Sequence, residues 1–472
     1  MAIHHRARWA VLVLVTGLIG SLGAATPTLA GEAVVGSPLG ERNAPRLTNS
    51  APCVEVINFA CSYLTVPLDR HGRKKGTLRL RVAVAGNAAA PRGVLMLLTG
   101  GPGQPGVGLA PRLVQRLSYL RVDYRLVLVD QRGTGAGAID CPRLQAEVGS
   151  SDVTPPSAQA VRECADRLGD ARNFYTTADT VADLEDLRRA LGVKSWTLDG
   201  VSYGTFVAQQ YGLTYPNRVK RMVLDSVVPQ GGAPALYEES LAHTHQVLRQ
   251  ACTEQQCGFD PATDLAMVVR RDDNGVGVLN LIISASIVEP KLTGQTFFPV
   301  LDLIHASAMG DSGRLNEAVQ ALLAGDGTPP AEYSSGLHVA TMCADIDEAP
   351  WGDSAAPLWL RDDAVEQALS KVDSEEVWPY EPKTTVEQGI VAACRNWPPA
   401  RPNPAARHHT LTMPVLLLAG DRDLSTPVQW AIEQAARTPR GQLVVVPGMG
   451  HSIQGRNPAG DAAVRQFLLS AA

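Results

Sequence analysis

Residues 195–204, which read SWTLDGVSYG, decide the fold. The apolar pattern of a buried strand over Ser195–Leu198 runs into the motif GVSYG, and a helical pattern follows over Thr205–Tyr215. A GxSxG motif between a strand and a helix predicts a tight turn that holds the hydroxyl of Ser202 above a sheet. The motif alone is weak evidence, since a glycine-rich turn with a spectator serine is the alternative. The strand-turn-helix setting favours a nucleophilic serine.

Apolar runs before and after this stretch predict the rest of a sheet. Ser62–Leu68 and Leu78–Ala85 alternate apolar and polar residues, as strands with one exposed face do. Val94–Leu98 and Leu126–Val129 are continuously apolar, which indicates strands buried on both faces. Arg221–Leu224 is predicted to be the next strand after the motif. The pattern therefore predicts a mostly parallel sheet covered by helices.

The rhythm changes after Val228. Residues 229–405 show helical patterns and loops rich in Pro, Gly and Asp, without alternation of strands and helices. The alternation then resumes with two predicted strands and two predicted helices: Pro414–Ala419, Pro427–Ala436, Gln442–Val446 and Ala459–Leu469. We therefore expect a core made of residues 31–228 and 406–472, with a mostly helical cap inserted at 229–405.

A serine nucleophile needs a general base. His451 ends the loop PGMGH directly after the last predicted strand, where an imidazole can hang over the edge of the sheet. A lone histidine in a loop is more often a solvated surface residue, but the chain order serine, acid, histidine is that of the triad of an α/β-hydrolase fold. The sequence predicts this fold, with Ser202 and His451 as nucleophile and base.

The acid of such a triad should follow the strand Pro414–Ala419, where the chain reads GDRDLSTP. It would accept the Nδ1–H of the histidine and stabilise the imidazolium. Asp421 and Asp423 both fit this position. Thr426 is predicted to be the N-cap of the helix that starts at Pro427, with Gln429 completing a capping box.

The oxyanion of an acyl-transfer intermediate requires backbone N–H donors that already point at it. One predicted donor is the amide of Tyr203, directly after the nucleophile. The other is expected in the loop LTGGPG at residues 98–103, where glycines allow a close approach of the backbone. We choose Gly101, with a plain Gly/Pro turn as the alternative.

The start of the chain has the pattern of an export signal. Arg6 and Arg8 precede an apolar run over Trp9–Gly23, and small residues follow up to Ala30. This pattern predicts a signal peptide at residues 1–30 and a secreted protein, with cell-wall association left open. A membrane anchor is the alternative, but the run is short for a spanning helix and we expect no stable membrane insertion.

Composition excludes several function classes. The chain has 472 residues, 45% hydrophobic and 19% charged, as in ordinary globular proteins. Its net charge of -5 falls to -7 without residues 1–30, which hold two arginines and no acid, so no nucleic-acid partner is expected. No CxxC motif occurs and no histidine stands near a cysteine at zinc-ligand spacing, so no metal is predicted.

Eight cysteines form an even set of close sequential pairs, which fits an oxidising compartment. We predict four local disulfides, although spacing does not fix connectivity. The predicted pairs are Cys53–Cys61, Cys141–Cys164, Cys252–Cys257 and Cys343–Cys394.

Four motifs together resemble the secreted bacterial tripeptidyl aminopeptidases and the related prolyl aminopeptidases. They are LTGGPG at 98–103, DQRGTG at 130–135, GVSYGT at 200–205 and GDRDLSTP at 420–427. In that family two residues separate the acid from a Thr-Pro pair, which selects Asp423 over Asp421. The prolyl enzymes usually carry histidine where this chain has Thr99. The resemblance extends from about Cys53 to the C-terminus and is weakest in the cap.

The resemblance implies a serine exopeptidase that releases tripeptides, other short peptides or single residues from a free N-terminus, without a cofactor. A carboxylate in the cap would bind the α-ammonium group. The candidate acids are Glu238, Glu239, Asp345, Asp347 and Glu348. We favour Asp345, because the predicted Cys343–Cys394 bridge would fix its backbone, although cap acids are usually solvated surface charges. A carboxylesterase and an inactive binding module are the alternatives, and the oligomeric state is not predicted.

Overall fold

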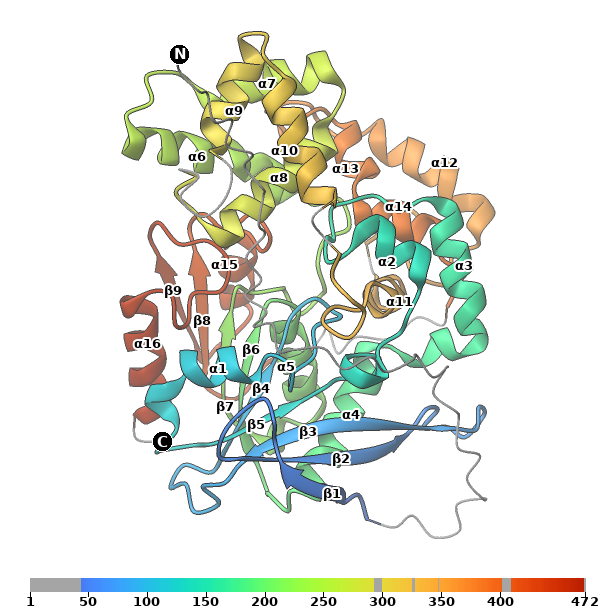
Figure 1. Cartoon of the computed structure of the whole chain (residues 1–472), viewed down its shortest axis with the longest axis vertical. Helices are drawn as coiled ribbons and strands as arrows, with labels where there is room; N and C mark the ends of the chain where they lie inside the picture. Colours follow the sequence, from blue (N-terminus) through green and yellow to red (C-terminus); the bar gives the residue numbers. More distant parts are fainter. Residues whose placement is uncertain (1–43, 293–298, 325–326, 347, 401–408, 471–472) are drawn as a thin grey trace, which may run out of the picture.

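The computed structural model describes residues 44–292, 299–324, 327–346, 348–400 and 409–470. Its nine-stranded sheet has the order β1-β2-β3-β5-β4-β6-β7-β8-β9 (Figure 1). The pairs β1/β2, β2/β3 and β3/β5 are antiparallel, and the strands from β5 to β9 are parallel. The predicted mostly parallel sheet is therefore confirmed. The predicted signal peptide at 1–30 and the candidate Asp347 lie outside the described residues.

The strands fall within a few residues of their predicted positions, and β1 was not predicted. They are β1 (Leu47–Pro52), β2 (Phe59–Pro67), β3 (Thr77–Ala85), β4 (Val94–Leu98), β5 (Arg125–Val129), β6 (Trp196–Val201), β7 (Val219–Asp225), β8 (Val415–Gly420) and β9 (Gly441–Val446).

Helices cover both faces of the sheet. Those of the core are α1 (Ala110–Arg116), α4 (Thr177–Ala190), α5 (Tyr203–Thr214), α15 (Val428–Ala436) and α16 (Pro458–Leu469). The strand β4 shows why both faces need cover, because all five of its residues are buried. Leu95 and Leu97 pack with α1 and α16, whereas Met96 and Leu98 pack with α4 and α5. The period-two alternation of a strand thus builds two apolar layers.

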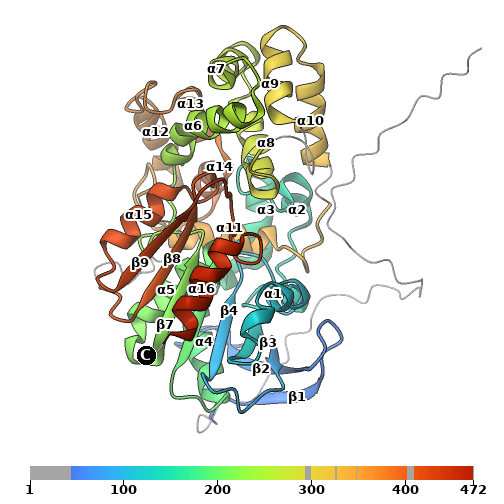
Figure 2. The same ribbon diagram turned by 90° about the vertical axis from the view of Figure 1, so that its left-hand side faces the viewer.

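A helical cap lies over one end of the sheet (Figures 1 and 2). The segment between β7 and β8 supplies α6 (Glu238–Gln255), α7 (Pro261–Asp272), α8 (Gly275–Val288), α9 (Val300–Ala308), α10 (Gly313–Ala324), α11 (Ser335–Asp345), α12 (Leu358–Leu369), α13 (Lys383–Glu387) and α14 (Gly389–Asn396). Two helices from the β5–β6 connection, α2 (Pro142–Val148) and α3 (Ala158–Leu168), share its apolar cluster. The cap therefore draws on two separate parts of the chain, and the boundaries at 228 and 405 stay predictions.

Four disulfides connect the cysteines as the sequence predicts. They are Cys53–Cys61, Cys141–Cys164, Cys252–Cys257 and Cys343–Cys394. Only the first lies in the sheet region; the Cys141–Cys164 bridge joins α2 to α3, and Cys343–Cys394 joins α11 to α14. Within the described ranges, no helix combines the length and the apolarity that crossing a membrane requires.

Candidate active site

Ser202 lies in a strained turn between β6 and α5. Its backbone has φ 57° and ψ -130°, a region that side chains other than glycine rarely occupy. A Cβ atom on Gly200 would come within 2.3 Å of the Gly204 carbonyl oxygen, and one on Gly204 within 2.4 Å of the Leu98 carbonyl oxygen. The two glycines of the motif are therefore required for the turn to close.

Asp423 and His451 meet at the carboxyl ends of β8 and β9. The Nδ1 atom of His451 lies 2.9 Å from Oδ2 and 3.2 Å from Oδ1 of Asp423. The Asp423 side chain is fully buried, and the backbone amides of Ser425 and Thr426 each donate to its Oδ1 at 2.9 Å. Asp421 instead accepts a hydrogen bond from the Gly448 amide at 2.7 Å. The geometry pairs the histidine with Asp423 and not with Asp421.

The prediction that Thr426 caps the next helix is wrong. The helix α15 begins at Val428, Pro427 occupies the N-cap position, and no side chain caps it. The hydroxyl of Thr426 donates to Oδ2 of Asp423 at 2.7 Å and lies 3.2 Å from Nδ1 of His451. A buried carboxylate with unfilled acceptor sites competes better for the hydroxyl than the helix terminus does, because leaving buried acceptors unsatisfied is costly.

The ion pair shifts both pKa values. Burial lowers the pKa of His451. The charge and the hydrogen bond of Asp423 raise this pKa by more than burial lowers it, so the net shift is upward. Burial raises the pKa of Asp423, but His451 and the donors of Thr426 outweigh burial, and the net shift is downward. The acid therefore stays ionised at neutral pH and favours a protonated histidine, as the support of a general base should.

The serine and the histidine do not form a hydrogen bond in this structure. Among the described residues, the ring contacts of His451 are with Asp423 and Thr426, and no hydrogen bond joins it to the Ser202 hydroxyl. Contacts of this kind are often long without substrate and tighten in the complex, so the arrangement still permits proton transfer. The structure thus brings acid and base into contact, whereas the serine follows β6, which β7 separates from the strands that carry them.

The His451 loop is held by a carboxylate that the sequence reasoning missed. Asp225, at the end of β7, accepts from the amide of Ile453 at 2.9 Å and from that of Gln454 at 2.9 Å. The neighbouring Ser226 hydroxyl accepts from the Ser452 amide at 2.7 Å. The sequence signal for this role is an acid at the end of a buried strand, because a buried carboxylate must accept hydrogen bonds from groups nearby.

The loop after β4 lies against the serine, as predicted. Gly101 has φ +106°, and a Cβ atom on Gly100 would come within 2.9 Å of the Cβ of Ser202. The Tyr203 amide belongs to the first turn of α5, where helical N–H groups have no intrahelical acceptor. Gly101, Ser202 and Tyr203 line one cavity. This placement agrees with the predicted oxyanion donors, whose role stays a prediction.

A cap helix fixes this loop from above. Nδ1 of His338, in α11, lies 3.0 Å from the Pro102 carbonyl oxygen, and the Ser334 amide donates to the Gly103 carbonyl at 3.1 Å. The Tyr333 hydroxyl lies 2.9 Å from the same Nδ1, so two contacts hold the His338 ring against the loop. Burial lowers the pKa of His338, which favours the neutral ring.

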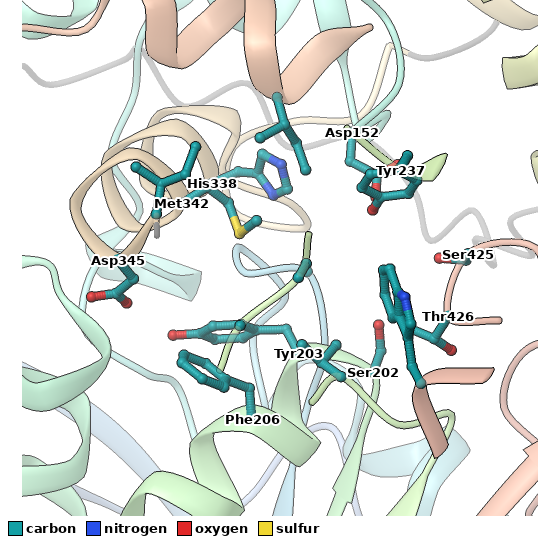
Figure 3. Close-up of a pocket in the computed structure, with 17 residues that line it drawn as sticks. Asp152, Ser202, Tyr203, Phe206, Tyr237, His338, Met342, Asp345, Ser425 and Thr426 are labelled. Atoms are coloured by element: carbon teal, nitrogen blue, oxygen red, sulfur yellow. The ribbon is translucent and has the colours of Figure 1, made fainter. Parts of the chain in front are cut away.

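The cavity that contains Ser202 lies between the sheet edge and the cap and is partly open to solvent (Figure 3). Its described lining is largely apolar and includes Phe206, Val228, Met342, Ile390 and Trp430. The hydroxyl of Ser202 points into it. No lysine or arginine is among the described lining residues, and the two carboxylates there belong to Asp152 and Asp345.

Asp345, the predicted amine anchor, lies in the wall of this cavity. Its Oδ2 accepts a hydrogen bond from the Thr177 amide at the start of α4, at 2.8 Å. Figure 3 shows Asp345 at the far side of the pocket from Asp152, with its carboxylate turned away from Ser202. Glu238 and Glu239 begin α6, and neither lines the cavity. The anchoring role of Asp345 therefore stays a prediction, and Asp152 is an acid that the sequence reasoning missed.

Comparisons with known proteins point to one family. A family model described as alpha/beta hydrolase fold matches residues 93–458. The tripeptidyl aminopeptidase of Streptomyces lividans is 26% identical over 452 residues, which cover 87% of this chain and 81% of the relative. The serine protease Hip1 of Mycobacterium tuberculosis is 33% identical over 208 residues, 39% of each protein. The probable proline iminopeptidase of Streptomyces coelicolor is 34% identical over 131 residues, 28% of this chain and 32% of that protein. The resemblance predicted from the motifs is thus confirmed.

Proposed function

Because the chain belongs to the alpha/beta hydrolase fold family, we propose that it is a secreted serine exopeptidase that releases tripeptides, other short peptides or single residues from free N-termini. One observation carries this proposal. Ser202 opens into a cavity whose described charged lining residues are both acids, and such a cavity favours a cationic group such as an α-ammonium. The likeness to a tripeptidyl aminopeptidase over 87% of the chain supports the same reading.

The reaction begins with attack of the Ser202 hydroxyl oxygen on the scissile carbonyl carbon. His451 accepts the hydroxyl proton, and Asp423 stabilises the resulting imidazolium through Nδ1. The amides of Tyr203 and Gly101 bind the developing oxyanion. His451 then donates the proton to the leaving amine, which departs and leaves the acyl group on Ser202. Water, deprotonated by His451, hydrolyses this ester and releases the N-terminal fragment as a carboxylic acid.

Export is part of the proposal. The four disulfides support an oxidising compartment, where such bridges persist. Sequencing the N-terminus of the protein recovered from culture medium tests cleavage after Ala30. An unprocessed N-terminus, or a protein found only inside the cell, would contradict this part.

The activity is tested with a panel of p-nitroanilide peptides and p-nitrophenyl esters. We expect peptides of one to three residues with free amines to be cleaved with a higher kcat/KM than their N-acetylated counterparts. The apolar side chains of the cavity also suit an acyl ester, so a carboxylesterase remains the second candidate. Rapid ester hydrolysis with no cleavage of any peptide would favour the esterase over the peptidase.

A further inference from the structure

Two carboxylates line the cavity, and its described lining residues include no lysine or arginine to balance their charge. Asp152 and Asp345 are the carboxylates, and the one imidazole, that of His338, is buried and favours its neutral form. A carboxylate in a largely apolar wall is costly unless a cation or hydrogen-bond donors compensate it. A substrate that carries an ammonium group would supply that compensation.

The two acids differ in what already compensates them. Asp345 accepts the amide of Thr177 at the N-terminus of α4, where the helix dipole also favours a negative charge. Asp152 accepts one hydrogen bond, from the Tyr237 hydroxyl to its Oδ2 at 3.1 Å. Within the described residues, its Oδ1 accepts none and no lysine or arginine pairs with it. Asp152 is therefore the acid with unused acceptor capacity.

The backbone that carries Asp152 is fixed from two sides of the cap. The Gly389 amide, at the start of α14, donates to the Val153 carbonyl at 2.8 Å. A Cβ atom on Gly389 would come within 2.3 Å of the Asp152 carbonyl oxygen, so the two segments are in direct contact. On the other side, Nδ2 of Asn280 in α8 donates to the Thr154 hydroxyl at 3.0 Å. A rigid backbone of this kind is what a charge-specific contact requires.

The partner of Asp152 is also held in place. Tyr237 is buried and packs edge-on against Trp430, with ring centroids 5.8 Å apart. Trp430 lines the same cavity as Thr426 and Ser202. The charge of Asp152 acts on His451, whose pKa it helps to raise, so the carboxylate is within electrostatic range of the catalytic end. Asp152 thus combines a fixed position, a free acceptor and access to the substrate cavity.

We infer that Asp152 receives the α-ammonium group of the substrate and sets the preference for free N-termini, while Asp345 serves as a partner of α4. This inference rests on the proposed exopeptidase function. The ammonium donates to the unused oxygen of Asp152, and Tyr237 holds the other oxygen. The charged group is thereby bound in a fixed place relative to Ser202, which limits how many residues fit between the N-terminus and the scissile bond.

The test is the ratio of kcat/KM for free-amine p-nitroanilide peptides to that for the same peptides N-acetylated. Asp152→Asn keeps the shape and removes the charge, and we expect the ratio to fall about 10- to 100-fold, as for loss of a charged hydrogen bond. The matched control is Glu238→Gln, an acid of α6 that does not line the cavity, for which we expect the wild-type ratio. Asp345→Asn should lower the ratio less than Asp152→Asn does. An N-acetylated peptide with a lysine side chain separates the α-ammonium from a side-chain amine.

Each outcome decides the matter. An unchanged ratio in Asp152→Asn, or a fall confined to Asp345→Asn, overturns the inference but leaves the exopeptidase intact. Cleavage of the acetylated lysyl peptide at the free-amine rate, lost in Asp152→Asn, overturns the assignment to the α-ammonium. Wild-type protein that cleaves no free-amine peptide overturns the proposed function itself. If circular dichroism shows Asp152→Asn to be unfolded, Tyr237→Phe provides the second test, with an expected fall of about 2- to 5-fold from loss of one neutral hydrogen bond.

Discussion

The two sides of the cavity are built in different ways. On the core side, Ser202, Asp423 and His451 all follow parallel strands of one sheet, which end at the same edge. On the cap side, Asp152 comes from the α2–α3 loop and Asp345 from α11, and helix packing and disulfides bring them to the cavity. The sheet register places the reacting groups, whereas the recognition groups depend on contacts between distant segments. Catalysis and recognition should therefore respond to different substitutions.

The largest effect should come from removing the nucleophile on the core side. Ser202→Ala and His451→Ala should each lower kcat by about 10⁴- to 10⁶-fold on peptides and esters alike, because triad members act as a unit. Circular dichroism should remain that of the wild type. A fluorophosphonate should label Ser202 alone, as peptide mapping by mass spectrometry would show. Near wild-type rates in either variant, or label on another serine, would contradict the proposed roles.

The same contrast explains what the sequence could predict. Ser202, His451 and the strands around them were located because a turn motif and a strand pattern are local signals. Asp423 was selected over Asp421 only through the family resemblance, and the contacts of His451 agree with that choice. The role predicted for Thr426 is wrong because a Thr-Pro pair before a helix gives the same sequence pattern in two cases. The hydroxyl can cap the helix, or it can donate to a buried acid, as it does here. Asp152 was missed because no local pattern marks a wall formed by α2, α11 and α14 together.

The next effect concerns the cap bridges. The Cys343–Cys394 disulfide joins residues 51 apart, whereas Cys252–Cys257 joins residues 5 apart. On the loop-entropy scale the longer loop is worth about 4 kcal/mol of folding free energy and the shorter about 2 kcal/mol. Replacing each pair by serine should thus destabilise the protein in that order in denaturant titrations. Equal losses, or a larger loss for the short loop, would contradict an entropic origin.

The acid limb of the pH profile tests the pair on the core side. The proposed mechanism needs neutral His451, and Asp423 raises the pKa of that imidazole above its ordinary value of about 6.5. Activity should therefore fall as the pH drops through this raised pKa, by about tenfold per pH unit below it. Asp423→Asn removes the charge that raises the pKa and should move the limb to lower pH, besides lowering the rate. The pH profiles of kcat/KM for a peptide and for an ester should fall at the same acidic pH. A fall centred at or below the ordinary histidine pKa would contradict this account.

The smallest effect should come from Arg456, which connects the two sides. Its guanidinium donates to the His451 carbonyl at 2.6 Å and, at the end of cap helix α8, to the carbonyls of Ile287 at 2.8 Å and Val288 at 3.0 Å. Arg456→Gln removes the fork, yet Asp225 still holds the histidine loop through two amides. We therefore expect kcat to fall only about 2- to 5-fold, less than a full charged hydrogen bond is worth, on peptides and esters alike.

The matched control for this connection is Arg249→Gln, which breaks an exposed ion pair with Asp260 within the cap. Exposed pairs contribute little, so this variant should keep wild-type kinetics. If Arg456→Gln raises only the KM of peptides and leaves kcat unchanged, the arginine serves only to hold the cap against the core. A loss in kcat on small esters, which need no contact with the cap, would mean that the cap positions the base. Among the described residues, the His451 carbonyl is the one core-side acceptor of a hydrogen bond from the Arg456 guanidinium.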